Sequence, residues 1–462
     1  MPYTESAMCP WTNTGAGEMN SLLAATLAAL GATFEPNWAS LDTRQTPPWF
    51  EDAKFGIFIH WGVYSVPAWG EKRKYAEWYW HDMQDKKGST WKFHERTYGT
   101  DFAYEDFAPM FTAEMFDPEH WAEVFEKSGA KYVVLTSKHH EGFPLWPSAH
   151  SPGWNAVDTG PKRDLAGDLM KAVRGRGLRM GYYYSMYEWF NPLYKSDPAR
   201  YVDEYMIPQL KDLVQRYKPD IVWPDGEWDH PSKTWRSEAF LVWLYNESNA
   251  PEDVVVNDRW GKECRNVHGG FATPEYGGIP DGRLIKEGRW EECQGMGHSF
   301  GYNRNETAED YRTSTQLLHL LIDSVSRGGN LLLDIGPTAD GRIPEIMEQR
   351  LLDIGAWLEV NGEAIYGAEH WADAPGNDKG TPLEHVRFTH KGDTLYAICL
   401  AWPGESLHIP LRVAFANARA TLLGSDKRIA TSYADGRMTL EIPCIAPDEL
   451  PCEHAFVFKL TR

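Results

Sequence analysis

The chain lacks several features that would quickly assign it to a class of proteins. Its 462 residues include only six cysteines, none in the Cys-x-x-Cys spacing of zinc ribbons and thioredoxin-type redox sites. It contains no GxGxxG fingerprint and no P-loop, so no motif favours a bound nucleotide. No apolar run reaches the roughly 20 residues that a membrane-spanning helix needs. We therefore expect no cofactor and no membrane span, and leave a Cys444–Cys452 bridge open.

Basic residues are also in short supply. The chain has 66 acidic against 46 basic residues, a formal net charge of −20. Such a charge repels nucleic acid and anionic membranes, so we expect neither as a partner. The apolar segment 22–32 resembles the core of a signal peptide, but Glu5 and Glu18 precede it where basic residues are usual. A leader and an ordinary N-terminal helix both remain open for residues 1–40.

Hydrophobic residues, at 42% of the chain, are sufficient for a large core. Between about residues 50 and 366, short apolar runs alternate with amphipathic helical patterns, which predicts strand–helix units around a parallel sheet. An internal Pro208 is expected to kink one of the helices. The predicted strands are 55–60, 132–137, 180–185, 221–225, 254–258 and 330–335. The predicted helices are 118–128, 164–176, 201–217, 235–246, 313–327 and 344–361.

Polar residues at the strand ends favour a (β/α)8 barrel over a doubly wound sheet, because all the strand ends of a barrel meet at one face. We predict such a TIM-like α/β barrel over residues 41–366. Beyond residue 367, short alternating runs separated by Gly, Asp and Pro predict an antiparallel β-sandwich over 367–462. The strand-end residues are His60, Lys138, His139, His140, Tyr184, Asp225, Asn257, Asp258 and Arg259.

The carboxylate of Asp225 is the leading catalytic candidate. It ends the apolar run 221–225 and lies among tryptophans, whose flat faces suit a pyranose ring, although an Asp that merely caps a turn would look similar. Glycoside hydrolysis needs a second carboxyl group across the scissile bond. Spacing does not choose among the candidates for it, which are Glu227, Glu275, Glu291 and Glu292.

Three histidines near strand ends allow two interpretations. His60, His139 and His140 could bind zinc, but their aromatic surroundings favour neutral imidazoles that hydrogen-bond sugar hydroxyls, so we predict no metal. Glu77, beside Trp78, suits bidentate recognition of hydroxyls.

Arg259 could bond the sugar or lower the pKa of Asp225, and a structural ion pair is the alternative.

Several segments together resemble the α-L-fucosidases of glycoside hydrolase family 29. They are FGIFIHWGVYSVPAW from Phe55, KYVVLTSKHHEGF from Lys131, VVVNDRWG from Val254, SFGYNR from Ser299 and GGNLLLDIGP from Gly328, with 183–190 and 223–228 between them. The resemblance covers about residues 34–366 and is strongest to the broad-specificity branch that includes the animal lysosomal enzyme. It implies a retaining exo-hydrolase that releases terminal L-fucose through a fucosyl-enzyme intermediate.

The resemblance also implies roles for individual residues. Asp225 matches the family's nucleophile, and Glu275 matches its acid/base, with Glu291 as the fallback. Tyr182 or Tyr183 could take the place of Tyr184, because consecutive tyrosines leave that position ambiguous. The implied fucose-binding positions are His60, Glu77, Trp78, His139, His140, Tyr184, Trp223, Arg259 and Phe300.

The implied substrates are fucosylated oligosaccharides or glycoconjugates, and a homo-oligomer and a secreted, periplasmic or lysosome-like location would fit the family. Rival interpretations are a silent fucose-binding barrel, a metal-dependent barrel hydrolase and an enzyme for related sugars such as α-L-galactosides.

Overall fold

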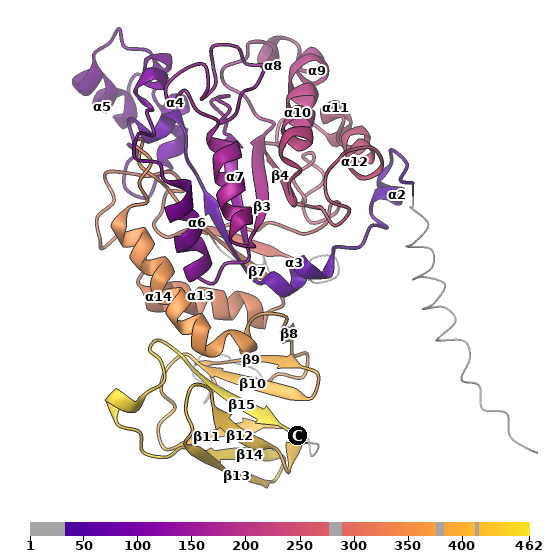
Figure 1. Cartoon of the computed structure of the whole chain (residues 1–462), viewed down its shortest axis with the longest axis vertical. Coiled ribbons are helices and arrows are strands. Elements are labelled where there is room, and N and C mark those ends of the chain that lie inside the picture. The colour runs from indigo at the N-terminus through magenta and orange to yellow at the C-terminus, as the bar shows by residue number, and fades with distance from the viewer. Residues whose placement is uncertain (1–32, 277–288, 376–382, 412–414) are drawn as a thin grey trace, which may run out of the picture.

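The computed structural model describes residues 33–276, 289–375, 383–411 and 415–462 (Figure 1). An α/β unit formed by about the first four fifths of the chain adjoins an antiparallel β unit formed by about the last fifth. The predicted signal-like segment 22–32 lies outside the described residues. Phe34, just after this segment, contacts the α/β unit. Its backbone N–H donates to Oδ1 of Asn246, and its carbonyl accepts from Nδ2 of Asn246.

Seven parallel strands curl into a barrel-like sheet in the order β5-β4-β3-β2-β1-β7-β6. Most are buried at every position, as expected for strands covered on both faces. The strands are β1 (Phe55–Ile59), β2 (Tyr132–Lys138), β3 (Arg179–Ser185), β4 (Ile221–Asp225), β5 (Val255–Val256), β6 (Glu291–Gly295) and β7 (Asn330–Ile335).

An irregular segment, 271–275, occupies the place of an eighth strand. Isolated parallel bridges join Phe271 to Asn257, which follows β5, and join Ala272 to Trp290 and Glu275 to Cys293 on the side of β6. Pro274 has no backbone N–H to donate, which limits regular pairing in this segment. The predicted fold class is therefore confirmed. In the described residues, the barrel sheet has seven regular strands, and one irregular segment bridges β5 and β6.

Strand β6 was not predicted, because its sequence, Glu-Glu-Cys-Gln-Gly, has no apolar run. All five residues are nonetheless buried. Glu291 is accommodated by hydrogen bonds from the hydroxyl of Tyr132 at 2.5 Å and from Nε1 of Trp223 at 3.0 Å. Satisfied hydrogen bonds let a carboxyl group occupy the barrel interior.

The six predicted helices are present, and Asp117, Asp164 and Thr313 cap three of them. They are α6 (Pro118–Lys127), α7 (Leu165–Gly175), α10 (Ile207–Tyr217), α12 (Ser237–Asn246), α13 (Ser314–Ser326) and α14 (Glu345–Asn361). The disturbance expected from Pro208 appears as a π-helical turn, η4 (Tyr201–Met206), directly before α10.

Shorter helices fill the connections: α2 (Trp38–Leu41), α3 (Pro48–Ala53), η1 (Val63–Ser65), η2 (Ala76–Trp78), α4 (Tyr79–Asp82), α5 (Ser89–Tyr98), η3 (Tyr104–Met110), α8 (Leu193–Ser196), α9 (Pro198–Arg200), α11 (Ser232–Trp235), η7 (Gly362–Ala364) and η9 (Pro447–Glu449). No helix in the described ranges combines the length and apolar character that crossing a membrane requires.

The C-terminal sheet has eight antiparallel strands in the order β11-β14-β13-β12-β15-β10-β9-β8. Side chains from both halves of this order share one hydrophobic core, as in a sandwich. The strands are β8 (Glu369–His370), β9 (Val386–Lys391), β10 (Thr394–Cys399), β11 (Ser406–Pro410), β12 (Arg419–Leu422), β13 (Arg428–Ala434), β14 (Arg437–Glu441) and β15 (Phe456–Thr461).

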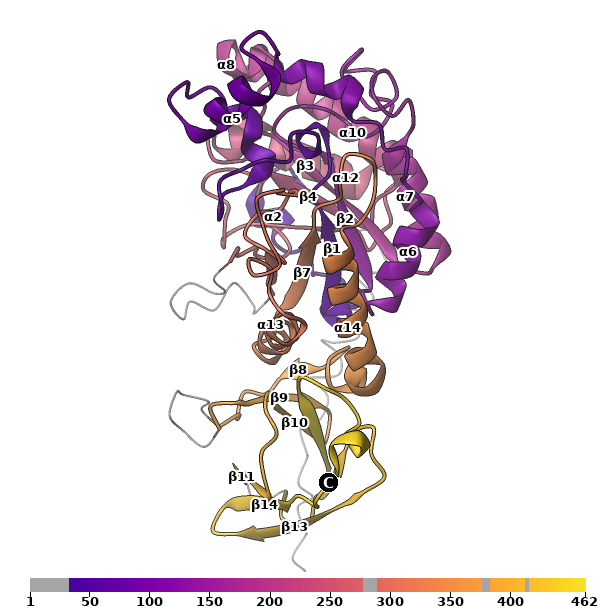
Figure 2. The same cartoon turned by 90° about the vertical axis from the view of Figure 1, so that its left-hand side faces the viewer.

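The other face of this sheet packs against the barrel. Figure 2 shows α13 and α14 lying between the barrel strands and the C-terminal sheet. Ile398 and Val457 point into the core of the barrel unit, and Nε1 of Trp357 donates to the carbonyl of Ala455 at 2.8 Å. Cys444 and Cys452 are both free thiols, so the bridge left open above is not formed.

Gly56 on β1 offers a test of packing inside the barrel. A Cβ at this position would lie 2.3 Å from the ring of buried Tyr132. We expect Gly56→Ala to lower the free energy of unfolding by about 1–3 kcal/mol, the usual range for overpacking. Gly175→Ala on α7 is the control, because a Cβ there meets no atom within 4 Å. Chemical denaturation measures both, and equal stability of the two variants would contradict the packing described here.

Candidate active site

One pocket at the carboxyl ends of the barrel strands brings together ten of the twelve residues singled out from the sequence: His60, Glu77, Trp78, His139, His140, Trp223, Asp225, Arg259, Glu275 and Phe300. Six of them lie on β4 or within three residues after the ends of β1, β2 and β5, and the closing segment 271–275 carries Glu275. Polar and aromatic side chains therefore converge from elements far apart in the chain. Phe58, Tyr75, Tyr183, Trp228 and Cys293 complete the lining.

Asp225 is the last residue of β4 and is 7% exposed. Its Oδ1 accepts a hydrogen bond from Arg259 at 2.6 Å, and its Oδ2 accepts one from the hydroxyl of Tyr183 at 2.9 Å. Burial alone would raise the pKa of this carboxyl, but the positive charge of Arg259, together with that of Arg265, holds it below its ordinary value. Asp225 is therefore an ionised, oriented carboxylate.

Arg259 connects the two carboxylates that were predicted to be catalytic. Its Nη1 donates to Asp225 at 2.6 Å and its Nη2 donates to Glu275 at 2.5 Å. The guanidinium is 4.4 Å from the centroid of the Trp223 ring. A single planar group thus sets the position of both carboxylates.

Arg259 is itself held by the closing segment. Its Nε donates to Oγ1 of Thr273 at 2.8 Å, and its Nη2 also donates to the carbonyl of Thr273 at 3.1 Å. The Thr273 hydroxyl then donates to Oδ1 of Asp258 at 2.7 Å, and Oδ2 of Asp258 accepts from the backbone N–H of Asn266 at 2.9 Å. This chain leaves the guanidinium little freedom to turn.

Glu275 and Glu291, the two alternatives for the acid/base, lie in different surroundings. The Glu275 side chain lines the pocket and is 31% exposed. Glu291 is fully buried two residues below Cys293 on β6, where burial raises its pKa to about 7. It bonds Tyr132 and Trp223 and does not line the pocket. Only Glu275 is in a position to meet a bound molecule.

The hydrogen bonds of His140 determine which of its ring nitrogens carries the proton. Ser185 Oγ lies 2.6 Å from Nδ1 of His140 and 2.6 Å from the carbonyl oxygen of Tyr187. The carbonyl can only accept, so the single hydroxyl proton goes to it, and Nδ1–H must donate to Ser185. Burial and the charge of His139 hold the pKa of His140 well below its ordinary value, so the ring is neutral. Its Nε2, 3.9 Å from Asp225, is an acceptor.

Glu77 and His60 supply further polar atoms to the pocket. Glu77 is 2% exposed, and its Oε2 accepts from the backbone N–H of Gly301 at 2.9 Å. Burial raises the pKa of Glu77 above its ordinary value. Nδ1 of His60 lies 2.6 Å from Oδ1 of Asp334, the next-to-last residue of β7.

An apolar wall faces these polar groups. The His60 ring stacks on Phe300, with centroids 4.8 Å apart, and Phe300 contacts Tyr75 at 5.5 Å and Phe58 at 6.4 Å between centroids. The pocket thus has one side suited to hydroxyl groups and one suited to C–H groups.

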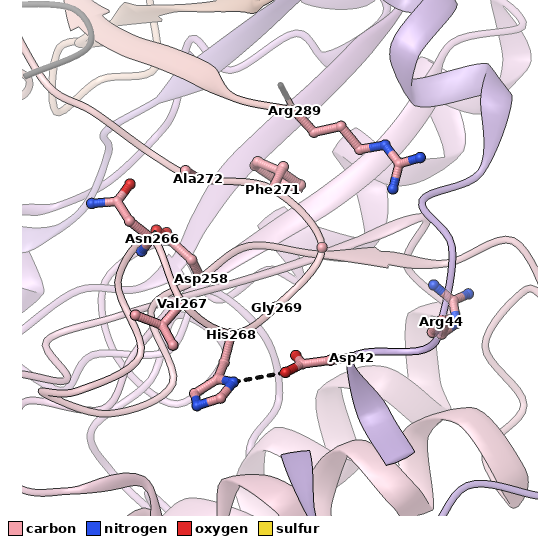
Figure 3. A pocket seen from close by; sticks show the side chains of 11 residues that line it. Asp42, Arg44, Asp258, Asn266, Val267, His268, Gly269, Phe271, Ala272 and Arg289 are labelled. Atoms are coloured by element: carbon pink, nitrogen blue, oxygen red, sulfur yellow. Dashed lines mark hydrogen bonds and ion pairs between the residues drawn. The ribbon is translucent and has the colours of Figure 1, made fainter. Parts of the chain in front are cut away.

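A second hollow lies beside residues 266–272 and is lined by none of the predicted site residues (Figure 3). There His268 Nδ1 lies 2.9 Å from Oδ2 of Asp42. Asp258, which accepts a hydrogen bond from Thr273, lines this hollow and not the first pocket. No cluster of three or more metal-binding side chains occurs among the residues that the structure describes.

Comparison with known proteins identifies the family. A family model described as "Alpha-L-fucosidase" matches residues 21–363, and one described as "Alpha-L-fucosidase C-terminal domain" matches residues 377–461. The chain belongs to the α-L-fucosidase family. It is 42% identical to the tissue α-L-fucosidase of Rattus norvegicus, over 96% of each chain. It is 43% identical to the tissue α-L-fucosidase of Homo sapiens, over 93% of this chain and 92% of the human one.

Solved fucosidase structures share the architecture. The crystal structure of the Thermotoga maritima α-fucosidase in complex with a mechanism-based inhibitor has a TM-score of 0.81 and 38% identity. The structure of that enzyme in complex with fucose has a TM-score of 0.80 and 38% identity. Each comparison covers 93% of this chain and 100% of the other.

The structure of this fucosidase places Tyr184, one of the predicted pocket residues, outside the pocket. Successive side chains of a strand point to opposite faces, so on β3 Tyr183 faces the barrel interior while Tyr182 and Tyr184 face the surrounding helices. The Tyr184 hydroxyl donates to Gln209 at 2.9 Å instead. Tyr183, left open as an alternative, lines the pocket. Tyr183 pairs with Trp223 across β3 and β4, so the two side chains lie on the same face of the sheet. An expectation that Trp223 faces the barrel interior would therefore have selected Tyr183.

Thr273, Tyr75, Cys293 and Asp334 were missed by sequence reasoning. Thr273 bonds Arg259, and Asp334 bonds His60, both of which were predicted. The sequence around Thr273 and Asp334 contains no motif that would have singled them out. Cys293 lies on β6, which was itself not predicted.

Thr273→Val tests the support of Arg259 at nearly constant volume. We expect kcat/KM for an aryl α-L-fucoside to fall about 10- to 100-fold, because an unpaired buried donor costs about 1–3 kcal/mol. Thr389→Val is the matched control. The buried Thr389 hydroxyl on β9 donates to the carbonyl of Ala364 in η7 at 2.8 Å and lies outside the pocket. Wild-type kcat/KM in a folded Thr273→Val variant would show that Arg259 does not need this support.

Proposed function

We propose that this protein is a retaining exo-α-L-fucosidase that releases terminal α-L-fucose from fucosylated glycans through a covalent fucosyl-enzyme intermediate. The observation that carries the proposal is the bridge from Asp225 through Arg259 to Glu275. Two carboxyl groups bonded to one guanidinium cannot lie far apart. Retaining glycosidases need a separation of about 5–5.5 Å, whereas inverting enzymes leave about 6.5–9.5 Å for a water molecule.

Asp225 is the nucleophile in this proposal. Its low pKa keeps it ionised, so that its oxygen can attack the anomeric carbon as the glycosidic C–O bond breaks. Tyr183 and Arg259 hold the two carboxylate oxygens, which leaves little rotation to be lost on the way to the transition state.

Glu275 is the acid/base in this proposal. In the first step its carboxyl gives a proton to the leaving oxygen, and in the second its carboxylate takes a proton from the water that attacks the fucosyl ester. Partial exposure of the Glu275 side chain suits both tasks, because the leaving group and the incoming water must reach it from the open side. Once Asp225 is esterified it carries no charge, and Arg259 is then free to stabilise the Glu275 carboxylate in its role as base.

Recognition of the sugar follows from the two sides of the pocket. The proposed hydrogen-bonding partners of the hydroxyl groups are His60, Glu77, His139 and His140. Phe300, Phe58 and Tyr75 offer an apolar surface to the C–H face and methyl group of a 6-deoxy sugar. A fucose complex of the similar Thermotoga maritima enzyme supports the choice of sugar. Unpaired polar groups in the site would discriminate against the wrong epimer.

Removal of the nucleophile is the direct test. We expect Asp225→Ala to lower turnover of an aryl α-L-fucoside by several orders of magnitude, and added azide to restore part of it by giving the fucosyl azide of inverted configuration. Mass spectrometry of wild-type enzyme treated with a 2-fluoro-fucosyl donor should place the adduct on Asp225. Full activity of the variant, or an adduct on another residue, would reject the assignment.

Leaving-group dependence separates Glu275 from Glu291. We expect Glu275→Gln to slow hydrolysis of fucosides with poor leaving groups by about 10²- to 10⁴-fold, the usual contribution of a general acid, and activated aryl fucosides much less. Glu291→Gln is the matched control, because it alters a carboxyl bonded to Tyr132 and Trp223 beneath the pocket.

We expect Glu291→Gln to lower the free energy of unfolding and to slow the hydrolysis of all fucosides equally, whatever their leaving group. The opposite pattern in the two variants would transfer the acid/base role to Glu291.

A further inference from the structure

Asp334 is a buried carboxyl group that the proposed reaction does not use. It is 1% exposed and faces the barrel interior from β7, above Leu332 of the same strand. Among the described residues its one ion-pair partner is His60, with 2.6 Å between Oδ1 and Nδ1. Its other oxygen, Oδ2, is buried and has no hydrogen-bond partner. Burying a charged carboxylate oxygen without a hydrogen-bond partner costs free energy, so this environment favours the neutral carboxylic acid.

His60 connects this carboxyl group to the pocket. Because Nδ1 faces Asp334, Nε2 is the ring nitrogen available to a bound molecule. The ring is fixed between Phe300, at 4.8 Å, and Phe58, at 4.7 Å between centroids. Whether Nε2 donates or accepts a hydrogen bond therefore depends on the proton between Nδ1 and Oδ1.

We infer that Asp334 is a positioning residue that keeps a proton on Nε2 of His60, so that His60 donates a hydrogen bond to a hydroxyl oxygen of the bound sugar. This inference rests on the proposed function only in naming a sugar as the bound molecule.

The proton count supports the assignment. If the Asp334 carboxyl is protonated, it donates to Nδ1, and the single proton of the neutral imidazole is on Nε2. If that proton moves across the short contact to Nδ1, the imidazolium still carries a proton on Nε2. Nε2 becomes an acceptor only when the pair as a whole loses a proton.

The surroundings favour the fully protonated pair. Burial, together with the nearby charge of Glu77, raises the pKa of Asp334 well above its ordinary value. Burial and the charge of His139 lower the pKa of His60 well below its ordinary value. A neutral carboxylic acid facing a neutral imidazole is the arrangement that both shifts favour.

The pocket then contains two histidines of opposite polarity. His60 presents an N–H, whereas His140 presents a lone pair, because its own proton is directed to Ser185. A sugar hydroxyl both donates and accepts, so one donor and one acceptor from the protein can orient neighbouring hydroxyl groups in a defined sense.

Nuclear magnetic resonance of the full-length protein labelled with ¹⁵N-histidine tests the proton directly, with His60→Gln to assign the His60 signals. We expect the Nε2 signal of His60 to be that of a proton-bearing nitrogen in the wild-type protein. An Nε2 without a proton at the pH of the activity assay would overturn the inference. This result can be read whether or not L-fucose proves to be the ligand, so it is separate from a failure of the proposed function.

Kinetics test the positioning role with two variants and a control. Asp334→Leu removes the partner of Nδ1, and we expect KM and the inhibition constant of L-fucose to rise about 10-fold while kcat changes less, as for one lost hydrogen bond. Asp334→Asn can donate its own N–H to Nδ1, so it should retain most of the wild-type affinity.

Asn330→Leu is the control, since it removes a buried polar group, bonded to the carbonyl of Phe50, from the same face of β7. It should lose stability but keep the wild-type affinity for L-fucose. An equal loss of affinity in the control, wild-type affinity in a folded Asp334→Leu protein, or a failure of Asp334→Asn to restore affinity would each overturn the positioning role.

Discussion

The active site depends on one buried cation. Arg259 is 1% exposed, and its guanidinium contacts Asp225, Glu275 and the backbone and side chain of Thr273. Without this charge, burial would favour the protonated form of Asp225. The planar shape matters as much as the charge, because separate nitrogens reach the two carboxylates and fix their relative position. A lysine could supply the charge but not this geometry.

The fold places this arginine through an irregularity of the barrel. Arg259 follows β5, which is only two residues long, and its supports come from the segment 271–275 that stands where a regular eighth strand would be. A regular strand would commit the backbone carbonyls of this segment to the sheet, whereas here the carbonyl of Thr273 accepts from the guanidinium. The barrel gives up some regular pairing at this position and gains a pocket wall that carries Glu275 and holds Arg259.

The sequence was sufficient for the apolar strands, the capped helices and the residues at strand ends, because burial and helix periodicity leave clear patterns. It was insufficient where tertiary contacts decide. The polar strand β6 is buried only because Tyr132 and Trp223, from distant strands, satisfy Glu291. The register of three consecutive tyrosines on β3 could not be settled without knowing which side of the strand faces the barrel interior. Thr273 and Asp334 meet Arg259 and His60 only in the folded chain, so the sequence contains no sign of these contacts.

Several buried carboxyl groups lie in or beside the pocket, and their surroundings shift their pKa values in different directions. Glu77, Asp225, Glu291 and Asp334 are all nearly inaccessible, and the buried guanidinium of Arg259 bonds one of them, Asp225. Of these four carboxyl groups, only Asp225 bonds Arg259 directly, and its pKa is lowered. Burial raises the pKa of the other three. Contact with Arg259 therefore lowers the pKa of one buried carboxyl group, while burial raises the pKa of the others. An arginine placed beside Asp334 instead would favour an anion beneath His60, and Asp225 would lose the main charge that lowers its pKa.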